Sequence, residues 1–282
     1  MAVRVVTDSL ADLPKDIAKD YGIEVVPLYV RFGDEEFKDG VTLSSDEFYK
    51  RLTAGPHSPK TAVPAVGEFA ELYSRLGQDA EGIVSIHISS KVSGTLNSAE
   101  QGAKEAKAKC PIEVVDSLQA SMAIGLIALT AARAAKKGAS FDEVVKLTRS
   151  AVTRAHCLTL MDTLEYLEKG GRIGKAAALL GSLLSFKPMV GLKDGEVHAF
   201  DKPRTRARGI EKLKEFLAQH SPVESYCVMH STVPEEAQAL LTELKASVKS
   251  DVPPILARYG PGLGTYIGPG GLGIGVIEKP RG

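Results

Sequence analysis

A hydroxyl-rich loop at residues 89–95, with the sequence SSKVSGT, contains the residue types of an anion-binding site. It follows an apolar run at 82–87 that predicts a buried strand, and it precedes a helical pattern at 96–107. The free N–H groups in the first turn of a helix and the helix macrodipole both favour negative charge there. We therefore expect Ser93, Gly94 and Thr95 to hold a carboxylate or a phosphate. The simpler alternative is that one of the hydroxyls only caps the helix.

Two further segments could supply polar groups to the same site. Thr61 places a hydroxyl in an extended segment before a predicted helix, and its alternative role is that of a turn or cap residue. The segment 260–271 is dense in Gly and Pro, which indicates forced turns or a close approach of the backbone to another group. Tyr266 is the one large polar side chain in it, and its hydroxyl can donate to an anion. The β-like run at 272–277 argues against a dinucleotide site, so the alternative is a simple turn.

Asp8 and Ser9 follow the first apolar run of the chain, at residues 3–7. In a parallel sheet, the loops at the carboxyl ends of the strands face the ligand. Asp8 is therefore either part of a binding site or the cap of the next helix, and the sequence favours neither reading.

The elements that must position these residues alternate between strand and helix. Predicted strands lie at 3–7, 24–30, 82–87, 112–116, 157–161, 225–230, 255–259 and 272–277, and a hairpin joins 187–192 to 196–200. Predicted helices lie at 14–20, 45–52, 66–76, 96–107, 120–137, 141–155, 205–219 and 234–248, and 164–181 is a helix interrupted by two glycines. This rhythm predicts an α/β fold with a largely parallel sheet. We expect two α/β lobes, residues 1–160 and 161–282, with the first strands pairing across them.

Composition narrows the possible partners and compartment. The 282 residues carry 35 basic and 35 acidic side chains, so nothing suggests nucleic-acid binding or more than transient contact with a membrane. The three cysteines and six histidines lack metal-binding spacing, and we expect no metal site. An odd, scattered set of cysteines fits a reducing cytoplasm. The first residues do not form a signal peptide, and the apolar stretch 120–135 predicts a core helix rather than a membrane span.

Five motifs, in this order, resemble the DegV family, the fatty-acid-binding subunits of bacterial fatty acid kinase. The motifs are TDS at 7–9 with DLP at 12–14, KT at 60–61 with Pro64, SSKVSGT at 89–95, EYL at 165–167 with GGRI at 170–173, and GT at 264–265 with GPG at 268–270. The resemblance covers essentially the whole chain.

This resemblance implies two α/β lobes, a mostly parallel N-terminal sheet and a mixed C-terminal one, with a long-chain fatty acid buried between them. It implies that Thr61 and Ser93 hold the carboxylate. A His in the glycine-rich segment usually completes the set, and here Tyr266 stands at that position. The Ala- and Leu-rich stretch 176–186 is a candidate lid over the acyl tail, with ordinary core as the alternative.

The resemblance also implies a partner, an ATP-dependent fatty acid kinase that converts the bound acid to acyl phosphate. Arg172 and Arg204 would face that kinase. The chain itself would be a carrier without catalytic machinery or cofactor, and it has no phosphate-binding GxxxxGK[ST] motif.

Two other functions use the same loop. One is a phosphometabolite-binding protein anchored at Ser93, which would have no use for a long apolar tunnel. The other is a serine hydrolase in which His230 and Asp116 activate Ser93, although the first glycine of a nucleophile elbow is missing.

Overall fold

A four-stranded parallel sheet organises the N-terminal half of the chain, as predicted. The computed structural model describes residues 2–55, 58–179 and 186–280. The strand order is β2-β1-β6-β7, and every pair is parallel. The strands are β1 (Arg4–Asp8), β2 (Ile23–Val26), β6 (Ile83–His87) and β7 (Ile112–Asp116). Since β1 lies between β2 and β6, the prediction that the first strands pair across the lobes is wrong.

A six-stranded mixed sheet forms the second half, in the order β10-β9-β8-β13-β11-β12. Its strands are β8 (Ala155–Leu160), β9 (Met189–Lys193), β10 (Glu196–Asp201), β11 (Val223–His230), β12 (Ile255–Arg258) and β13 (Leu272–Glu278). The β11–β12 pair is parallel and the other pairs are antiparallel. β8 belongs to this sheet, although its residues lie within the predicted N-terminal lobe, 1–160. The chain therefore leaves the parallel sheet and enters the mixed sheet before residue 160, with β8 beginning at Ala155.

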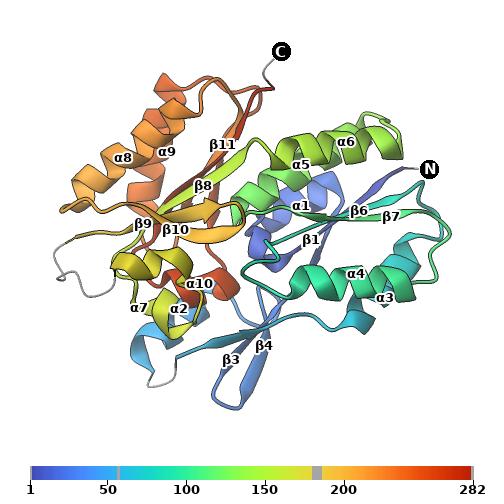
Figure 1. Cartoon of the computed structure of the whole chain (residues 1–282), viewed down its shortest axis with the longest axis horizontal. Helices are drawn as coiled ribbons and strands as arrows, with labels where there is room; N and C mark the ends of the chain where they lie inside the picture. The colour runs from blue at the N-terminus through green and yellow to red at the C-terminus, as the bar shows by residue number, and fades with distance from the viewer. Residues whose placement is uncertain (1, 56–57, 180–185, 281–282) are drawn as a thin grey trace.

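Helices cover both sheets, and one of them lies between the two (Figure 1). On one face of the parallel sheet lie α3 (Val66–Leu76) and α4 (Thr95–Glu105), and on the outer face of the mixed sheet lie α8 (Arg206–Gln219) and α9 (Pro234–Ser247). α5 (Met122–Lys136) packs against strands of both sheets, with α1 (Lys15–Tyr21) and α6 (Phe141–Val152) beside it. Because α5 is apolar on nearly every face, it can be buried from both sides.

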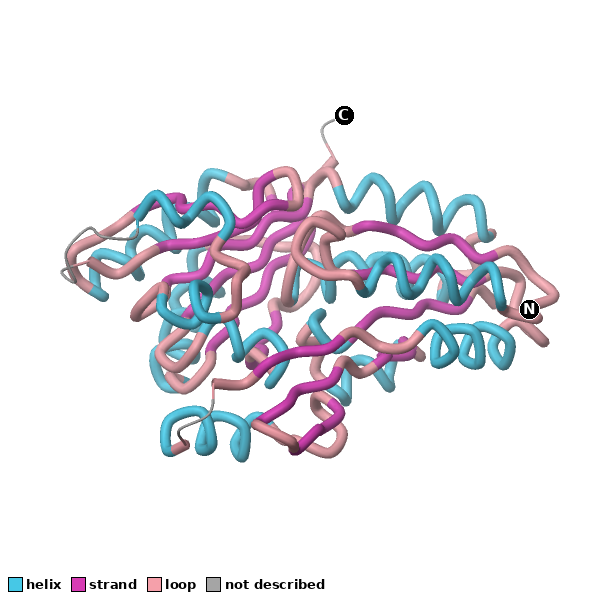
Figure 2. Tube along the Cα trace, turned by 60° about the horizontal axis from the view of Figure 1, so that its bottom comes forward, coloured by secondary structure: helices cyan, strands magenta, loops and turns pink. Residues whose placement is uncertain are grey.

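A small antiparallel sheet, in the order β4-β3-β5, projects below the larger ones (Figures 1 and 2). Its strands are β3 (Tyr29–Phe32), β4 (Glu35–Lys38) and β5 (Lys60–Ala62), and α2 (Ser45–Ala54) packs against it. The predicted strand 24–30 is therefore two strands, because Pro27 lacks the N–H that a continuous ladder needs. The cap of α2 is Ser44, whose Oγ accepts the N–H of Glu47 at 3.2 Å.

Short helices make up the remaining elements. η1 (Ser9–Ala11) follows β1, and the predicted helix 164–181 is α7 (Glu165–Lys169) and η2 (Gly174–Leu179), separated at the two glycines as expected. The glycine-rich segment contains a helix, α10 (Pro261–Ile267), which the sequence analysis did not predict. Close packing explains it: a Cβ at Gly264 would lie 2.6 Å from the Phe48 ring.

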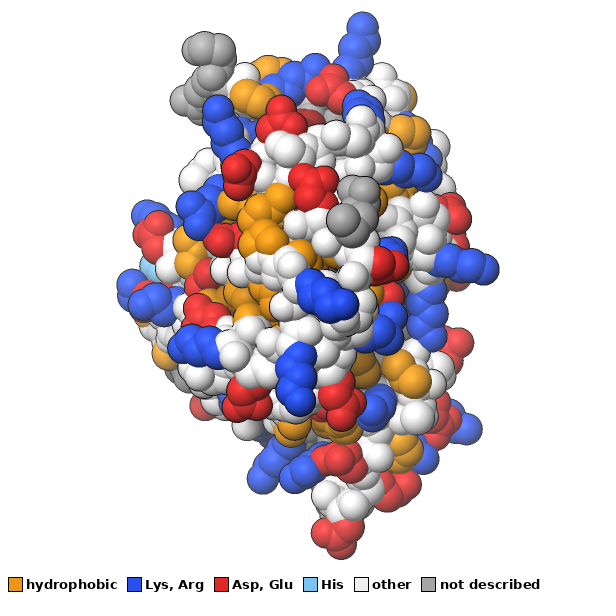
Figure 3. All heavy atoms as spheres, turned by 90° about the vertical axis from the view of Figure 1, so that its right-hand side faces the viewer, with side chains coloured by type: hydrophobic (Ala, Val, Ile, Leu, Met, Phe, Trp, Pro, Cys, Tyr) orange, Lys and Arg blue, Asp and Glu red, His pale blue; other side chains and the backbone are white. Residues whose placement is uncertain are grey.

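Charges of both signs are interspersed over the face of the molecule in Figure 3, so no field of a single sign dominates that face. Among the described helices, none has the length and apolar character needed to cross a membrane.

A buried carboxylate beneath α10 predicts a pH-dependent stability. Asp39 is 3% exposed, and its Oδ2 accepts the Ser9 hydroxyl at 2.7 Å. Burial raises the pKa of Asp39 to about 6, so the folded state holds this proton more tightly than the unfolded chain. The associated stability is present at low pH and is lost as pH rises through about 4 to 6, a change on the order of 3 kcal/mol.

Asp39→Asn mimics the protonated acid and should remove that loss. We compare the free energies of unfolding of this variant and of the natural protein, both measured by urea titration. The difference, variant minus natural protein, should rise between pH 4 and pH 6 and then stay level. Asp34→Asn, at an exposed carboxylate, is the control and should leave the difference flat. A flat difference for Asp39→Asn would show that this group does not ionise near pH 6.

Candidate functional site

An apolar cavity lies where segments of the two large sheets meet. The space inside it, together with the solvent-open space at its mouth, is about 870 Å³. A largely apolar pocket with a few polar groups is typical of a ligand site. The N-terminal half contributes lining residues from the loops after β1 and β6, and the C-terminal half contributes them from β8, β9 and α10. Apolar members of the lining include Leu28, Ile88, Met161, Val190, Leu192 and Leu263.

Thr61 and Tyr266 meet at this cavity, although 205 residues separate them in the sequence. Thr61 is the middle residue of β5, and Tyr266 lies in the last turn of α10. Their hydroxyl oxygens are 2.5 Å apart, and either can be the donor. Both side chains are half-buried. The predicted convergence of these two segments is therefore present.

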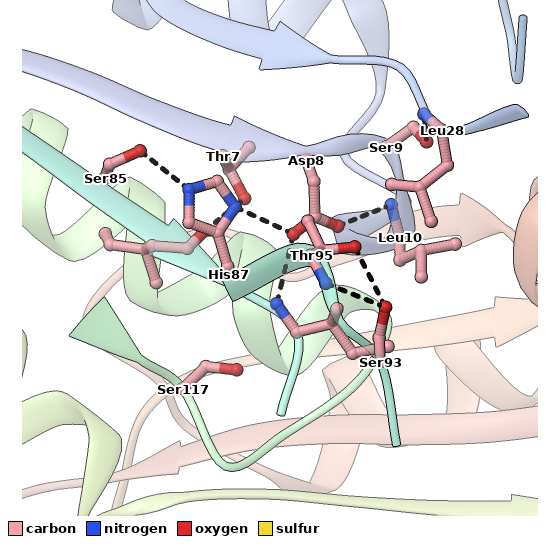
Figure 4. Close-up of polar contacts among 12 residues, drawn as sticks. Thr7, Asp8, Ser9, Leu10, Leu28, Ser85, His87, Ser93, Thr95 and Ser117 are labelled. Atoms are coloured by element: carbon pink, nitrogen blue, oxygen red, sulfur yellow. Dashed lines mark hydrogen bonds and ion pairs between the residues drawn. The ribbon is translucent and has the colours of Figure 1, made fainter. Parts of the chain in front are cut away.

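Ser93 also lines the cavity, from the loop that enters α4. Its Oγ lies 2.9 Å from Thr95 Oγ1 and accepts the Thr95 N–H at 3.3 Å, so the two side chains face each other (Figure 4). Gly94 is the N-cap residue of α4 and has no side chain to cap it. The Ser93 hydroxyl accepts the N–H of Thr95, the first residue of the helix, and also lines the cavity, so it is not only a helix cap.

The other predicted members of the loop lie outside the cavity lining of the described chain. Gly94 is exposed and borders a surface hollow beside the cavity, and Thr95 is buried beneath Ser93. Thr95 therefore contacts Ser93 rather than the cavity.

Arg172 lies at the junction of the cavity and this hollow, and it lines both. Its side chain donates to the backbone carbonyls of Gly170 at 3.0 Å and Val92 at 3.4 Å. Its guanidinium carbon is 5.7 Å from the centre of the Tyr266 ring, within the range of a cation–π contact. A positive charge thus lies beside the hydroxyls, on a side chain that is also exposed to solvent.

Arg204 is exposed just before α8 and lies apart from both the cavity and the hollow. Within the described ranges its side chain makes no hydrogen bond or ion pair. In the candidate lid, Ala176 is buried in the core around Leu167, and residues 180–185 lie outside the described residues.

Asp8 caps the turn after β1 and does not line the cavity. Its Oδ1 accepts the Leu10 N–H at 3.0 Å, while Oδ2 accepts the Ile88 N–H at 3.1 Å and lies 2.9 Å from His87 Nδ1 (Figure 4). On the other side of the ring, His87 Nε2 lies 2.7 Å from Ser85 Oγ. This fully buried network holds Leu10 and Ile88 in the cavity wall.

Sequence reasoning missed the polar groups in the inner wall of the cavity. Thr159 Oγ1 and Tyr259 Oη are 2.8 Å apart, and Ser121 donates to Asp12 at 2.6 Å. Burial raises the pKa of the Cys157 thiol to about 11, so it is neutral at physiological pH. Because these groups satisfy one another or are uncharged, the inner wall can contact an apolar ligand at little cost.

The serine-hydrolase arrangement is not assembled. The hydrogen-bond partner of the Ser93 hydroxyl among the described residues is Thr95, which is not a base. His230 borders a different surface hollow, and Asp116 accepts from Ser90 at 2.6 Å and from the Leu118 N–H at 2.9 Å. No base in the described part of the chain therefore lies within reach of Ser93.

A family model described as "Uncharacterised protein, DegV family COG1307" matches residues 2–279. The chain belongs to the DegV family. A relative from Clostridium perfringens, DegV domain-containing protein CPE0304, is 35% identical over 99% of this chain and 100% of its own length.

Solved DegV structures share the fold. A fatty-acid-binding DegV family protein from Thermus thermophilus is 32% identical, with a TM-score of 0.89, over 99% of this chain and 100% of its own. A protein from Eubacterium ventriosum, described as binding stearic acid, is 27% identical, with a TM-score of 0.88, over 98% of both chains. The predicted fold and family are thereby confirmed.

Proposed function

We propose that this DegV protein binds one long-chain fatty acid in the cavity and presents its carboxylate to an ATP-dependent fatty acid kinase, which forms the acyl phosphate. The observation that carries the proposal is an apolar cavity whose wall includes Thr61, Tyr266 and Ser93. The fatty-acid-binding relatives of the same fold support the ligand class.

The two hydroxyl pairs can each provide one donor to a carboxylate. In the Thr61–Tyr266 pair, one hydroxyl donates its proton to the other. The accepting hydroxyl then still has its own proton free to donate to a carboxylate. The Ser93–Thr95 pair can do the same when Thr95 donates to Ser93. Two O–H donors match the two oxygens of a carboxylate, and Arg172 adds positive charge beside Tyr266.

The head group would lie at the open end of the cavity. Ser93 and Arg172 line both the cavity and the adjoining surface hollow, so a carboxylate held there would remain within reach of a second protein. The tail would supply most of the affinity, because each buried methylene contributes about 0.8 kcal/mol. The chain would act as a carrier in the cytoplasm, without a cofactor or a catalytic step of its own.

Native mass spectrometry of the purified protein, followed by solvent extraction and lipid identification, tests the ligand. We expect a stoichiometric adduct that is a long-chain fatty acid. A protein that stays at its apo mass when fatty acids are added would overturn the proposal.

Arg172→Ala should separate binding from transfer. We expect fatty-acid affinity to fall by less than about tenfold, because hydroxyls hold the head group, and acyl-phosphate formation with the kinase to fall by more than about tenfold. Arg204→Ala, remote from the cavity, should lower acyl-phosphate formation alone. Fluorescent fatty-acid titration and trapping of the acyl phosphate with hydroxylamine measure the two effects. If Arg172→Ala abolishes binding, Arg172 holds the ligand rather than the kinase.

A further inference from the structure

Two imidazoles and a carboxylate converge in the six-stranded sheet and its covering helix, outside the cavity lining of the described chain. His156 lies in β8, His220 directly follows α8, and Glu278 ends β13. Their candidate ligand atoms all lie within 4.8 Å of one another. Imidazole nitrogens with a carboxylate oxygen are a common ligand set for Zn²⁺ and related divalent transition metals. These residues lie far apart in the sequence and form no short metal-binding motif, so the sequence analysis did not predict a metal site.

The sheet register brings the strand residues together. β13 runs antiparallel to β8 with Val276 opposite His156, so Glu278 is the diagonal neighbour of His156 on the same face. β9 pairs with β8 at residues 158–160, so among the described residues no strand of the sheet pairs with His156 on that side.

The helix places the third residue over this face. Phe216, in the last turns of α8, packs against the sheet, and its ring centre lies 4.6 Å from that of His220. The His220 and His156 rings are stacked with their centres 4.2 Å apart. Both imidazoles therefore lie beside each other and close to the Glu278 carboxylate.

The distances are close to those of a metal centre. Two ligand bonds of about 2.1 Å at the tetrahedral angle hold their donor atoms about 3.4 Å apart. His156 Nε2 lies 3.6 Å from Glu278 Oε1, and His220 Nδ1 lies 2.6 Å from the same oxygen. The second contact is shorter than a shared ion allows, so an ion would enter with a rotation of the His220 or Glu278 side chain.

The electrostatic surroundings permit a cation. The neighbouring Arg154 forms an ion pair with Glu224 at 2.8 Å, and Lys279 forms one with Asp251 at 2.6 Å, so acidic groups offset both positive charges.

We propose that His156, His220 and Glu278 bind a divalent transition-metal ion of the zinc class. Their side chains retain 35%, 20% and 20% exposure, which leaves access for water as a further ligand. The ion would join the end of α8 to β8 and β13, and its effect would be on stability rather than on fatty-acid affinity.

Calorimetric titration of chelator-treated protein with ZnCl₂ tests the site. We expect one ion per chain, and a rise in Tm of about 5 °C at zinc concentrations about a hundredfold above Kd. MgCl₂ should produce neither effect, because Mg²⁺ prefers oxygen ligands.

The double variant His156→Gln/His220→Gln should lose this binding, and Glu278→Gln should weaken it while preserving side-chain size. His198→Gln is the matched control, since His198 also lies near a carboxylate, 4.0 Å from Glu196, but outside the cluster. The proposal would be overturned if the natural protein bound no zinc, or if the double variant and Glu278→Gln bound zinc as tightly as the natural protein does. Fatty-acid titration with and without zinc keeps this result separate from the proposed function.

Discussion

Replacing a sixteen-carbon fatty acid by its eight-carbon homologue should weaken binding by about 10³-fold. Eight methylenes contribute about 6 kcal/mol of gross burial free energy. Ordering the longer tail offsets part of this, which leaves about 4 kcal/mol, or about three decades in Kd. The lining of Leu28, Ile88, Met161 and Val190 supplies the surface against which the tail would be buried.

A titration series from eight to eighteen carbons measures this effect. We expect affinity to rise with each methylene until the cavity is full and then to level off, and that length would identify the acyl preference. Inorganic phosphate and sugar phosphates, used as competitors, should not displace a long-chain acid. Equal affinity for the two chain lengths would show that the tail lies outside the cavity and would favour the phosphometabolite alternative.

The double variant Ser93→Ala/Thr61→Val should lose about 10²- to 10⁴-fold in affinity for a long-chain fatty acid. Each substitution removes one hydroxyl proposed to donate to the carboxylate, and a hydrogen bond to a charged group contributes about 1.5–3 kcal/mol. Both side chains are half-buried, and Val preserves the shape of Thr, so the fold should survive.

Comparing a fatty acid with the alcohol of equal length isolates the head group. The natural protein should prefer the acid, and the double variant should bind the two almost equally. Ser150→Ala, at an exposed serine of α6, is the matched control and should change neither affinity. An undiminished preference for the acid in the double variant would place the carboxylate elsewhere, with Arg172 as the next candidate.

Local sequence patterns predicted a helix or strand correctly where the residues of that element alone determine its type. The apolar run before the hydroxyl loop is β6, the pattern after it is α4, and α5 is buried as its continuous apolar composition predicts. Hydrophobic periodicity reports which faces are covered, and it does so without knowledge of what covers them.

Local patterns failed where contacts between distant segments outweigh propensity. α10 forms although three of its seven residues are Gly or Pro, because Pro261 is tolerated in the first turn and Gly264 admits the Phe48 ring. Asp8 had two equal interpretations until its contacts with Leu10, His87 and Ile88 identified it as a cap within a buried network.

The order of apolar and polar residues along this chain was thus sufficient for the α/β class, the parallel first sheet and the hydroxyl-rich entry to α4. Folding in three dimensions was needed to join Thr61 to Tyr266 across 205 residues, to bring Arg172 beside them, and to assemble His156, His220 and Glu278. The physical reason is range: propensity and periodicity act over a few residues, whereas hydrogen bonds and ligand geometry depend on ångström distances set by how the two large sheets pack around α5.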